Sequence, residues 1–335
     1  MAPAASLYAS QLRRELGARN RIYARGRNCV QSYGDPPVVV YAPDEAGHGN
    51  FFDPAYQAIL ARPEWLRRLD KVHTGARSLP KAERKWRELD SSMSSDALLM
   101  NIFCTPGVAE SKTVRSLLGV DAEDPPIFGW RAGVRLTSGR VDRTEVDMKW
   151  GSLLVEAKLT ESDFQTCSPG LVAGYHDLTT VFDLDLLPRA SIAIGRRKPS
   201  VEFPEDYTQE EIRVPVEDWE PQVWEMPPES ISGYASYQLI RNVLAAHAIQ
   251  ASFCVILDQR RPDLRETWYQ VMAAVTDAAL RVRLKVLTWQ ELVHALPRDL
   301  RLFLAQKYGI VPPGAPAWPI EDATDSVGFY SAGMS

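Results

Sequence analysis

Four charged residues stand close together in the segment TEVDMKWGSLLVEAKLTES, residues 144–162. Glu145 and Asp147 precede a glycine, and Glu156 and Lys158 follow it, in a largely apolar surrounding that predicts two strands joined by a turn. Side chains alternate between the two faces of a strand, so each of these pairs shares one face of its own strand.

The position of the turn decides which charged side chains meet. If the turn falls at Gly151 and Ser152, Asp147 lies opposite Glu156. If it falls one residue earlier, Glu145 lies opposite Glu156 instead. Both two-residue turns gather the four charged side chains on one face, whereas a three-residue loop would divide them between the two faces.

Opposed carboxylates on paired strands repel each other, and a divalent cation between them would remove the conflict. Oxygen ligands favour Mg²⁺ or Mn²⁺ over zinc. Lys158 beside such an ion could orient and help to deprotonate a water, or stabilise charge that develops on a phosphate. The alternative is a structural ion pair between Glu156 and Lys158 on an edge strand.

The elements around this segment must hold it in place. The sequence SSDALLMNIFC predicts a helix over 94–104 with Ser94 or Ser95 as its N-cap, and strands follow over 127–159. A helix over 234–250 and the strand SFCVILD come later, after a long insertion. The predicted class is mixed α/β.

The charge distribution and proline content divide the chain into regions. Residues 1–90 hold fifteen Lys and Arg against ten Asp and Glu, although the net charge of the whole chain is -5. We interpret this region as a basic, mainly helical extension packed on a core at 91–310, and residues 311–335 as an extended tail. Within the core, an acidic, proline-rich insertion is expected at about 162–232.

Composition excludes several classes of protein. The four cysteines form no CxxC pair, which argues against a cysteine-rich zinc site and indicates reduced thiols in a cytoplasmic protein. No apolar run is long enough to span a membrane, so no membrane partner is expected. The Arg-rich start superficially resembles a mitochondrial transit peptide, but we favour a surface helix followed by a basic segment. The chain has no P-loop, GxGxxG or GxSxG sequence.

Asp147, eight intervening residues and then Glu156-Ala157-Lys158 resemble the signature of the PD-(D/E)XK nuclease superfamily, which has the restriction-endonuclease-like fold. The expected order of elements, α-β-β-β-α-β, is similar to the core of that fold. The resemblance extends over about 90–290 and points to a bacterial restriction-type branch.

The resemblance implies a role for each residue of the signature. Asp147, Glu156 and the Ala157 carbonyl would ligate Mg²⁺, and Lys158 would act on the attacking water. Glu145 is an additional acid that could support a second metal or replace Asp147 as the principal ligand.

Three further residues are supporting candidates. Gln238 resembles the glutamine on the second core helix of RecB-like nucleases, which helps to place the lysine or the DNA. That motif ends in an aromatic residue where this chain has Asn242, which leaves the role of Gln238 open. Ser95 and Asn101 lie on roughly one face of the first core helix, where they either support the site or act as a cap and a buried polar contact.

The leading hypothesis is therefore a metal-dependent DNA endonuclease that hydrolyses phosphodiesters with a Mg²⁺-activated water. Arg260, Arg261 and Arg265, in the segment DQRRPDLR, are candidate DNA contacts. The alternatives are a nuclease-like module that binds DNA or protein without cutting, and an acidic interaction protein whose charged hairpin is structural. The sequence leaves a homodimer open.

Overall fold

The structure is a computed structural model. It describes residues 4–31, 38–45, 47–72, 87–193 and 230–320. Residues 194–229 of the acidic, proline-rich insertion that we expected at about 162–232 lie outside the described residues, as does the end of the predicted tail.

A five-stranded sheet forms the centre of the molecule, with the strand order β11-β10-β7-β6-β5. Its strands are β5 (Ile127–Arg135), β6 (Val141–Trp150), β7 (Leu153–Ala157), β10 (Ser252–Leu257) and β11 (Leu284–Thr288). The pairs β5–β6 and β6–β7 are antiparallel, and the pairs β7–β10 and β10–β11 are parallel. The predicted mixed α/β class is confirmed.

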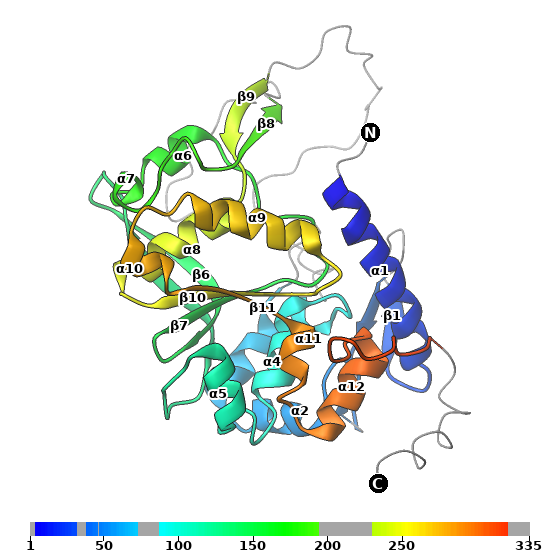
Figure 1. Cartoon of the computed structure of the whole chain (residues 1–335). Coiled ribbons are helices and arrows are strands. Elements are labelled where there is room, and N and C mark those ends of the chain that lie inside the picture. Colours follow the sequence, from blue (N-terminus) through cyan, green and yellow to red (C-terminus); the bar gives the residue numbers. More distant parts are fainter. Residues whose placement is uncertain (1–3, 32–37, 46, 73–86, 194–229, 321–335) are drawn as a thin grey trace, which may run out of the picture.

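Helices cover both faces of this sheet (Figure 1). One face carries α8 (Tyr237–Ala248) and α9 (Pro262–Ala273). The other carries α4 (Ser95–Phe103), α5 (Lys112–Leu118), α11 (Trp289–Val293) and α12 (Arg298–Tyr308). The sheet divides the core into two apolar clusters, which we call the α4 side and the α8 side.

Strand β7 is buried on both faces, as its continuous apolar sequence predicts. Val155 and Ala157 pack on the α4 side, and Leu154 packs on the α8 side. A charged residue in β7 therefore cannot reach bulk water unless it lies near the end of the strand. Glu156 lies near this end, and Lys158 is the first residue after the strand.

Helix α4 begins where the sequence predicts. The hydroxyl of Ser94 accepts a hydrogen bond from the Ala97 backbone N–H and caps the first turn. Every residue of the helix from Asp96 to Phe103 is buried, so its first turn brings an acid into the interior next to the sheet.

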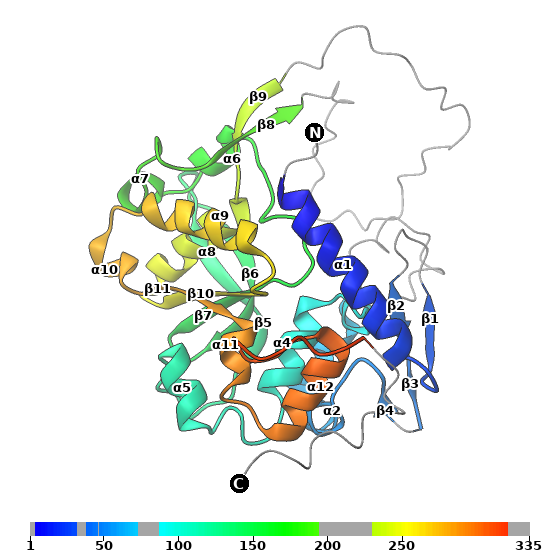
Figure 2. The same ribbon diagram turned by 45° about the vertical axis from the view of Figure 1, so that its right-hand side comes forward.

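The described part of the N-terminal region contains helices and also four short strands, which are labelled in Figure 2. The helices are α1 (Ala4–Tyr23), α2 (Asp53–Leu60) and α3 (Pro63–Leu66), followed by the 3₁₀ turns η1 (Arg67–Asp70) and η4 (Glu88–Asp90). The strands are β1 (Cys29–Gln31), β2 (Val39–Tyr41), β3 (Pro43–Asp44) and β4 (Gly47–His48). Pro63 separates two of these helices, because α2 ends before it and α3 begins there.

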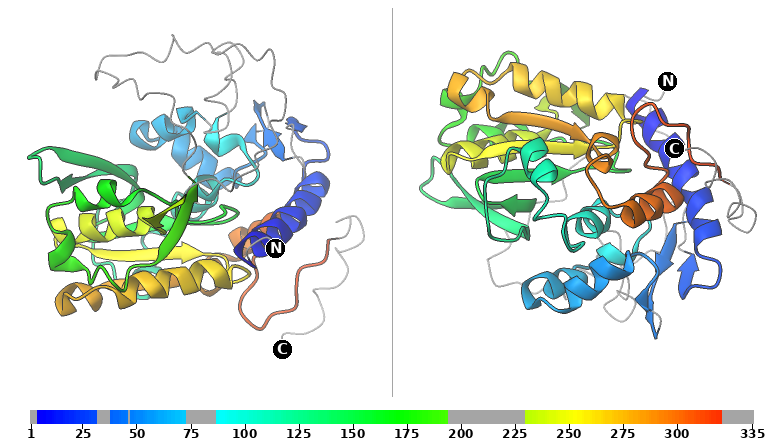
Figure 3. Two further views of the ribbon diagram at one scale, coloured as in Figure 1. Left: turned by 90° about the horizontal axis from the view of Figure 1, so that it is seen from above. Right: turned by 60° about the horizontal axis from the view of Figure 1, so that its bottom comes forward.

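The described part of the insertion forms small elements near α8 and α9 (Figure 3). These are α6 (Pro169–Ala173), α7 (Leu178–Val181) and the antiparallel pair β8 (Arg189–Ala193) and β9 (Ser230–Tyr234), while α10 (Ala278–Arg281) precedes β11. None of the described helices is both long and apolar enough to cross a membrane.

Candidate active site at Asp147, Glu156 and Lys158

The turn between β6 and β7 falls at Gly151 and Ser152, because Trp150 pairs with Leu153. The last pair of this ladder is Met148 with Val155. One position further along, the same register places Asp147 beside Glu156, which is the first of the two alternatives considered from the sequence. Gly151 has φ 55°, which a glycine adopts without strain.

Strand β6 changes its facing at Asp147. Val146 packs on the α8 side, yet Met148, two positions on, packs on the α4 side. Gly129 on β5 lies opposite Asp147 and has φ 63°, and the ladder of paired residues skips this position. The distortion turns the Asp147 side chain toward β7, where its Oδ2 accepts a hydrogen bond of 2.8 Å from the Ala157 backbone N–H.

Glu156 and Lys158 form a buried ion pair at the end of β7. Their side chains are 3% and 6% exposed, and Glu156 Oε1 lies 2.8 Å from Lys158 Nζ. The ion pair that we considered as the structural alternative is present, but on a central strand rather than at an edge. Burying two charges costs several kcal/mol of desolvation per ion, so further polar partners are needed to hold them there.

Helix α8 supplies those partners one turn apart. Gln238 Oε1 accepts a hydrogen bond of 3.0 Å from Lys158 Nζ, and Asn242 Nδ2 donates one of 2.8 Å to Glu156 Oε2. Gln238 therefore lies beside the lysine, as the resemblance implied. Asn242, the residue that departs from the motif, fixes the second carboxylate. We call Asp147, Glu156, Lys158, Gln238 and Asn242 together the Asp147 cluster.

The charges in this cluster are not balanced. Burial, then the charge of Glu156 and then that of Asp96 raise the pKa of Asp147 well above its usual range, and Lys158 opposes this shift only in part. Burial alone would lower the pKa of Lys158, but the neighbouring carboxylates, Glu156 foremost, outweigh it and raise that pKa. Lys158 therefore stays protonated at neutral pH, while Asp147 resists ionisation.

Glu145 does not join the other three charged residues as we expected. Its Oε1 lies 2.6 Å from Arg68 Nη1 and 3.7 Å from Lys71 Nζ. The reason is the change of facing at Asp147, which leaves Glu145 on the α4 side of the sheet, whereas Glu156 and Lys158 meet α8. The predicted gathering of four charges on one face is therefore wrong for Glu145.

A second charged group occupies the α4 side. Asp96 Oδ2 lies 2.9 Å from Arg68 Nη2 and 2.7 Å from Lys71 Nζ. Burial would raise the pKa of Asp96, but Arg68 and then Lys71 outweigh it and lower that pKa. The sequence analysis did not single out these three residues. Asp96 could have been noticed as the acid of the first helical turn, whereas Arg68 and Lys71 belong to the region that we had interpreted as a basic extension outside the core.

The two supporting residues on α4 have different surroundings. Ser95 Oγ donates a hydrogen bond of 2.5 Å to Glu161 Oε1, and Glu161 Oε2 accepts one of 2.7 Å from the Leu159 N–H, so Ser95 steadies the loop after Lys158. Asn101 instead bonds to the backbone of the segment before α2, accepting from the Phe52 N–H at 2.6 Å. Asn101 is thus a buried structural contact, the second of the two interpretations considered for it.

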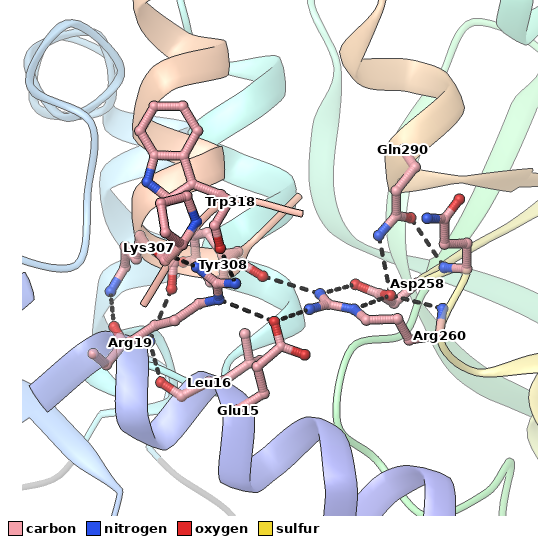
Figure 4. Close-up of polar contacts among 12 residues, drawn as sticks. Glu15, Leu16, Arg19, Asp258, Arg260, Gln290, Lys307, Tyr308 and Trp318 are labelled. Atoms are coloured by element: carbon pink, nitrogen blue, oxygen red, sulfur yellow. Dashed lines mark hydrogen bonds and ion pairs between the residues drawn. The ribbon is translucent and has the colours of Figure 1, made fainter. Parts of the chain in front are cut away.

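Two of the three arginines predicted to contact DNA are used inside the protein. Arg260 bonds Asp258 and Glu15, as Figure 4 shows. The Arg261 side chain is 0% exposed and bonds Asp263 and the Glu161 carbonyl. The sequence analysis did not foresee these internal contacts, and a role of the two residues in DNA binding stays a prediction. Arg265 is half-buried and stays a prediction.

The Asp147 cluster offers few acidic side chains that could bind a metal ion. Among the residues that the structure describes, no group of three or more His, Cys, Asp or Glu side chains is arranged to hold one. Asp147 and Glu156 nevertheless repel each other strongly enough to raise a pKa, and a cation is the group that relieves such repulsion. A hard cation can complete its shell with backbone oxygen and water, as Mg²⁺ usually does.

A protein-family model described as "Restriction Endonuclease associating with ARP" matches residues 17–309. The chain belongs to this family. The match to the Restriction Endonuclease associating with ARP family includes the Asp147 cluster and also Arg68, Lys71 and Asp96, so the charged residues on both sides of the sheet lie within it. Membership places the chain among restriction-endonuclease-type proteins. A search of curated proteins and a search of solved structures gave no match.

Proposed function

We propose that this protein is a metal-dependent DNA endonuclease of the PD-(D/E)XK type, with its active site at the Asp147 cluster. The observation that carries the proposal is the convergence of Asp147, Glu156 and Lys158, with Gln238 and Asn242 holding two of them. The family match supports nuclease chemistry, and the order α4, β5, β6, β7, α8, β10 supports the restriction-endonuclease-like core.

In this proposal Asp147, Glu156 and the Ala157 carbonyl hold Mg²⁺, for which Mn²⁺ can substitute. The bound ion would supply Lewis acidity and a water of lowered pKa. The Ala157 N–H already fixes the Asp147 carboxylate, and Asn242 fixes that of Glu156, so both ligands are oriented before an ion arrives.

Lys158 acts as a hydrogen-bond donor and positive charge, because its raised pKa keeps the proton on Nζ. Gln238 holds the ammonium group in place. From there the amine orients the attacking water and stabilises negative charge that develops on the phosphate. Loss of one such preorganised donor typically costs about 10²- to 10³-fold in rate.

Plasmid and single-stranded DNA incubated with the purified protein and Mg²⁺ or Mn²⁺ test the proposal. We expect cleavage that EDTA stops and that Asp147→Asn and Lys158→Met reduce by about 10²-fold or more. Glu266→Gln removes an exposed carboxylate on α9 and serves as the control that should cut normally.

The proposal is wrong if the wild type cuts no DNA with either ion, or if the two site variants cut as well as the control. DNA binding without cleavage would instead identify a non-catalytic nuclease-like module. A homodimer stays a prediction, and light scattering of the protein with and without DNA measures it directly.

A further inference from the structure

The hairpin of β5 and β6 has one buried face and one exposed face. Ala132, Val134 and Val146 point to the α8 side and are buried there. The alternate residues point the other way, and Figure 3 shows this edge of the sheet from two further directions. Three of these alternate residues are arginines, and all three are exposed: Arg131, Arg135 and Arg143. We call them the arginine face.

The arginine face holds charge that the protein itself does not use. Among the described residues, none of the three guanidinium groups takes part in an ion pair. Glu145 lies opposite Arg131 in the ladder, but its carboxylate forms an ion pair with Arg68. This differs from Arg260 and Arg261, which bind internal partners. Exposed and unpaired arginines on a β-surface can bind anions without first breaking an internal contact.

The arginine face leads directly to the Asp147 cluster. Arg143 and Glu145 share one side of β6, and Asp147 follows two positions later, where the strand changes its facing and turns that side chain toward β7. Asp147 lies four positions after Arg143, which is about 14 Å along a strand. DNA carries one phosphate per about 3.4 Å of helix axis on each strand, so this span corresponds to a few nucleotides. At the inner end Arg68 and Lys71 are already paired with Asp96 and Glu145, so the free positive charge lies on the arginine face itself.

We propose that the arginine face binds the phosphate backbone of the nucleic acid whose scissile phosphate lies at the Asp147 cluster. The inference rests on the proposed function for the identity of the ligand, but not on cleavage. The contacts that we assign to this face are to phosphates, which position a nucleic acid and carry no base specificity of their own. These phosphate contacts fix on which side of the scissile phosphate the bound strand lies against the protein.

Binding of a labelled DNA duplex in EDTA tests this inference apart from catalysis. The variant combines Arg131→Gln, Arg135→Glu and Arg143→Glu. Glutamine is used at position 131 because a new acid there would stand opposite Glu145. Removing one arginine–phosphate interaction should reduce the slope of log affinity against log salt by about 0.9, so the triple variant should show a slope smaller by about 2.7.

The matched control is Arg298→Glu, which reverses an exposed charge at the start of α12, away from the hairpin. Its affinity and salt slope should equal those of the wild type, and thermal melting should show that both proteins are folded. Unchanged affinity and slope in the triple variant overturn the inference. So does a wild type that binds no DNA, or one that binds polyglutamate as tightly, which would point to an acidic protein as the partner of this surface.

The two proposals can fail separately. If the triple variant loses binding while the wild type never cuts, the arginine face stands and the nuclease is refuted. If the wild type cuts and the triple variant binds and cuts equally well, the nuclease stands and the arginine face is refuted.

Discussion

Two charged networks in this molecule differ in how their charges are balanced. The first joins α1 to the end of α12 and to the loop after β10, and we call it the clasp (Figure 4). In it Glu15 lies between Arg19 at 3.0 Å and Arg260 at 2.7 Å, and Arg260 reaches Asp258 at 2.6 Å. Two cations alternate with two anions, so each charge has an opposite neighbour.

Backbone and amide groups complete the clasp. Arg19 Nη2 donates to the Trp318 carbonyl at 2.7 Å, and Gln290 donates to Asp258 at 3.1 Å. The residues after α12 are thereby held against the N-terminal helix, which ties the two described ends of the chain together (Figures 2 and 4). Satisfied networks of this kind rigidify a structure.

The Asp147 cluster has the opposite character. Two acids share a single lysine, and the charges on the α4 side already pair among themselves. Asp147 is therefore the acid without a cation of its own, in agreement with its raised pKa. Burial of charge thus does not by itself mark a site: Arg19 and Asp258 of the clasp are buried and balanced, whereas the acids of the Asp147 cluster are buried and unbalanced.

Disruption of the clasp should give the largest change in stability. Asp258→Ala removes the 0% exposed acid that Arg260 and Gln290 both contact. Loss of one partner in such a network typically costs about 1–3 kcal/mol, because the Gln290 amide loses its acceptor and Arg260 keeps only Glu15 as an acidic partner. Urea unfolding measures the loss, and Glu266→Ala on the surface of α9 should be nearly neutral. A change for Asp258→Ala as small as that of the control would contradict our account of the clasp.

Removal of an acid from the Asp147 cluster should stabilise the protein, whereas removal of Asp258 from the clasp should destabilise it. Asp147→Asn keeps an acceptor for the Ala157 N–H but removes the repulsion with Glu156. In EDTA we expect it to raise the free energy of unfolding at neutral pH by at least about 1 kcal/mol, since one pKa unit corresponds to about 1.4 kcal/mol. Urea unfolding of both proteins provides the measurement. A destabilised variant would show that Asp147 is compensated in the same way as Asp258.

The effect of Asp147→Asn should also depend on pH. The unfolded chain releases the Asp147 proton near pH 4, whereas the folded protein keeps it to higher pH. Between these two pKa values the folded state binds more protons, so the stability of the wild type falls as pH rises. The advantage of Asp147→Asn should therefore grow above pH 4, by at most about 1.4 kcal/mol per pH unit. A gap that stays constant over this window would contradict the raised pKa.

The sequence predicts local features well and distant partners poorly. The turn at Gly151, the cap at Ser94 and the burial of β7 follow from patterns within a few residues. The ion pair between Glu145 and Arg68 does not follow from such a pattern, because the two residues are 77 positions apart. The alternation of residues in β6 gives no information about the position of η1. The internal contacts of Arg260 are hidden from the sequence for the same reason, since its partner Glu15 comes from the other end of the chain.

The smallest expected effect concerns a buried lysine next to the clasp. Lys307 is 0% exposed, its Nζ donates to Asn20 Oδ1 at 2.7 Å, and it lies 4.1 Å from the centre of the Tyr41 ring. Burial, and then the charge of Arg27, lowers the pKa of Lys307 well below its usual range. Since well-packed apolar residues can often replace buried charged groups, Lys307→Met should change stability at neutral pH by no more than about 1 kcal/mol.

The sign of its pH dependence separates Lys307 from Asp147. The unfolded chain holds the lysine proton up to about pH 10.4, and the folded protein releases it earlier. Between these values the unfolded state binds more protons, so the stability of the wild type relative to Lys307→Met should rise with pH, opposite to the trend at Asp147. Lys112→Met, at an exposed position on α5, should show no such trend. If the stability of the wild type relative to Lys307→Met did not rise between neutral pH and pH 10, the amine would be charged in the folded state. Asn20 and the face of the Tyr41 ring would then hold that charge.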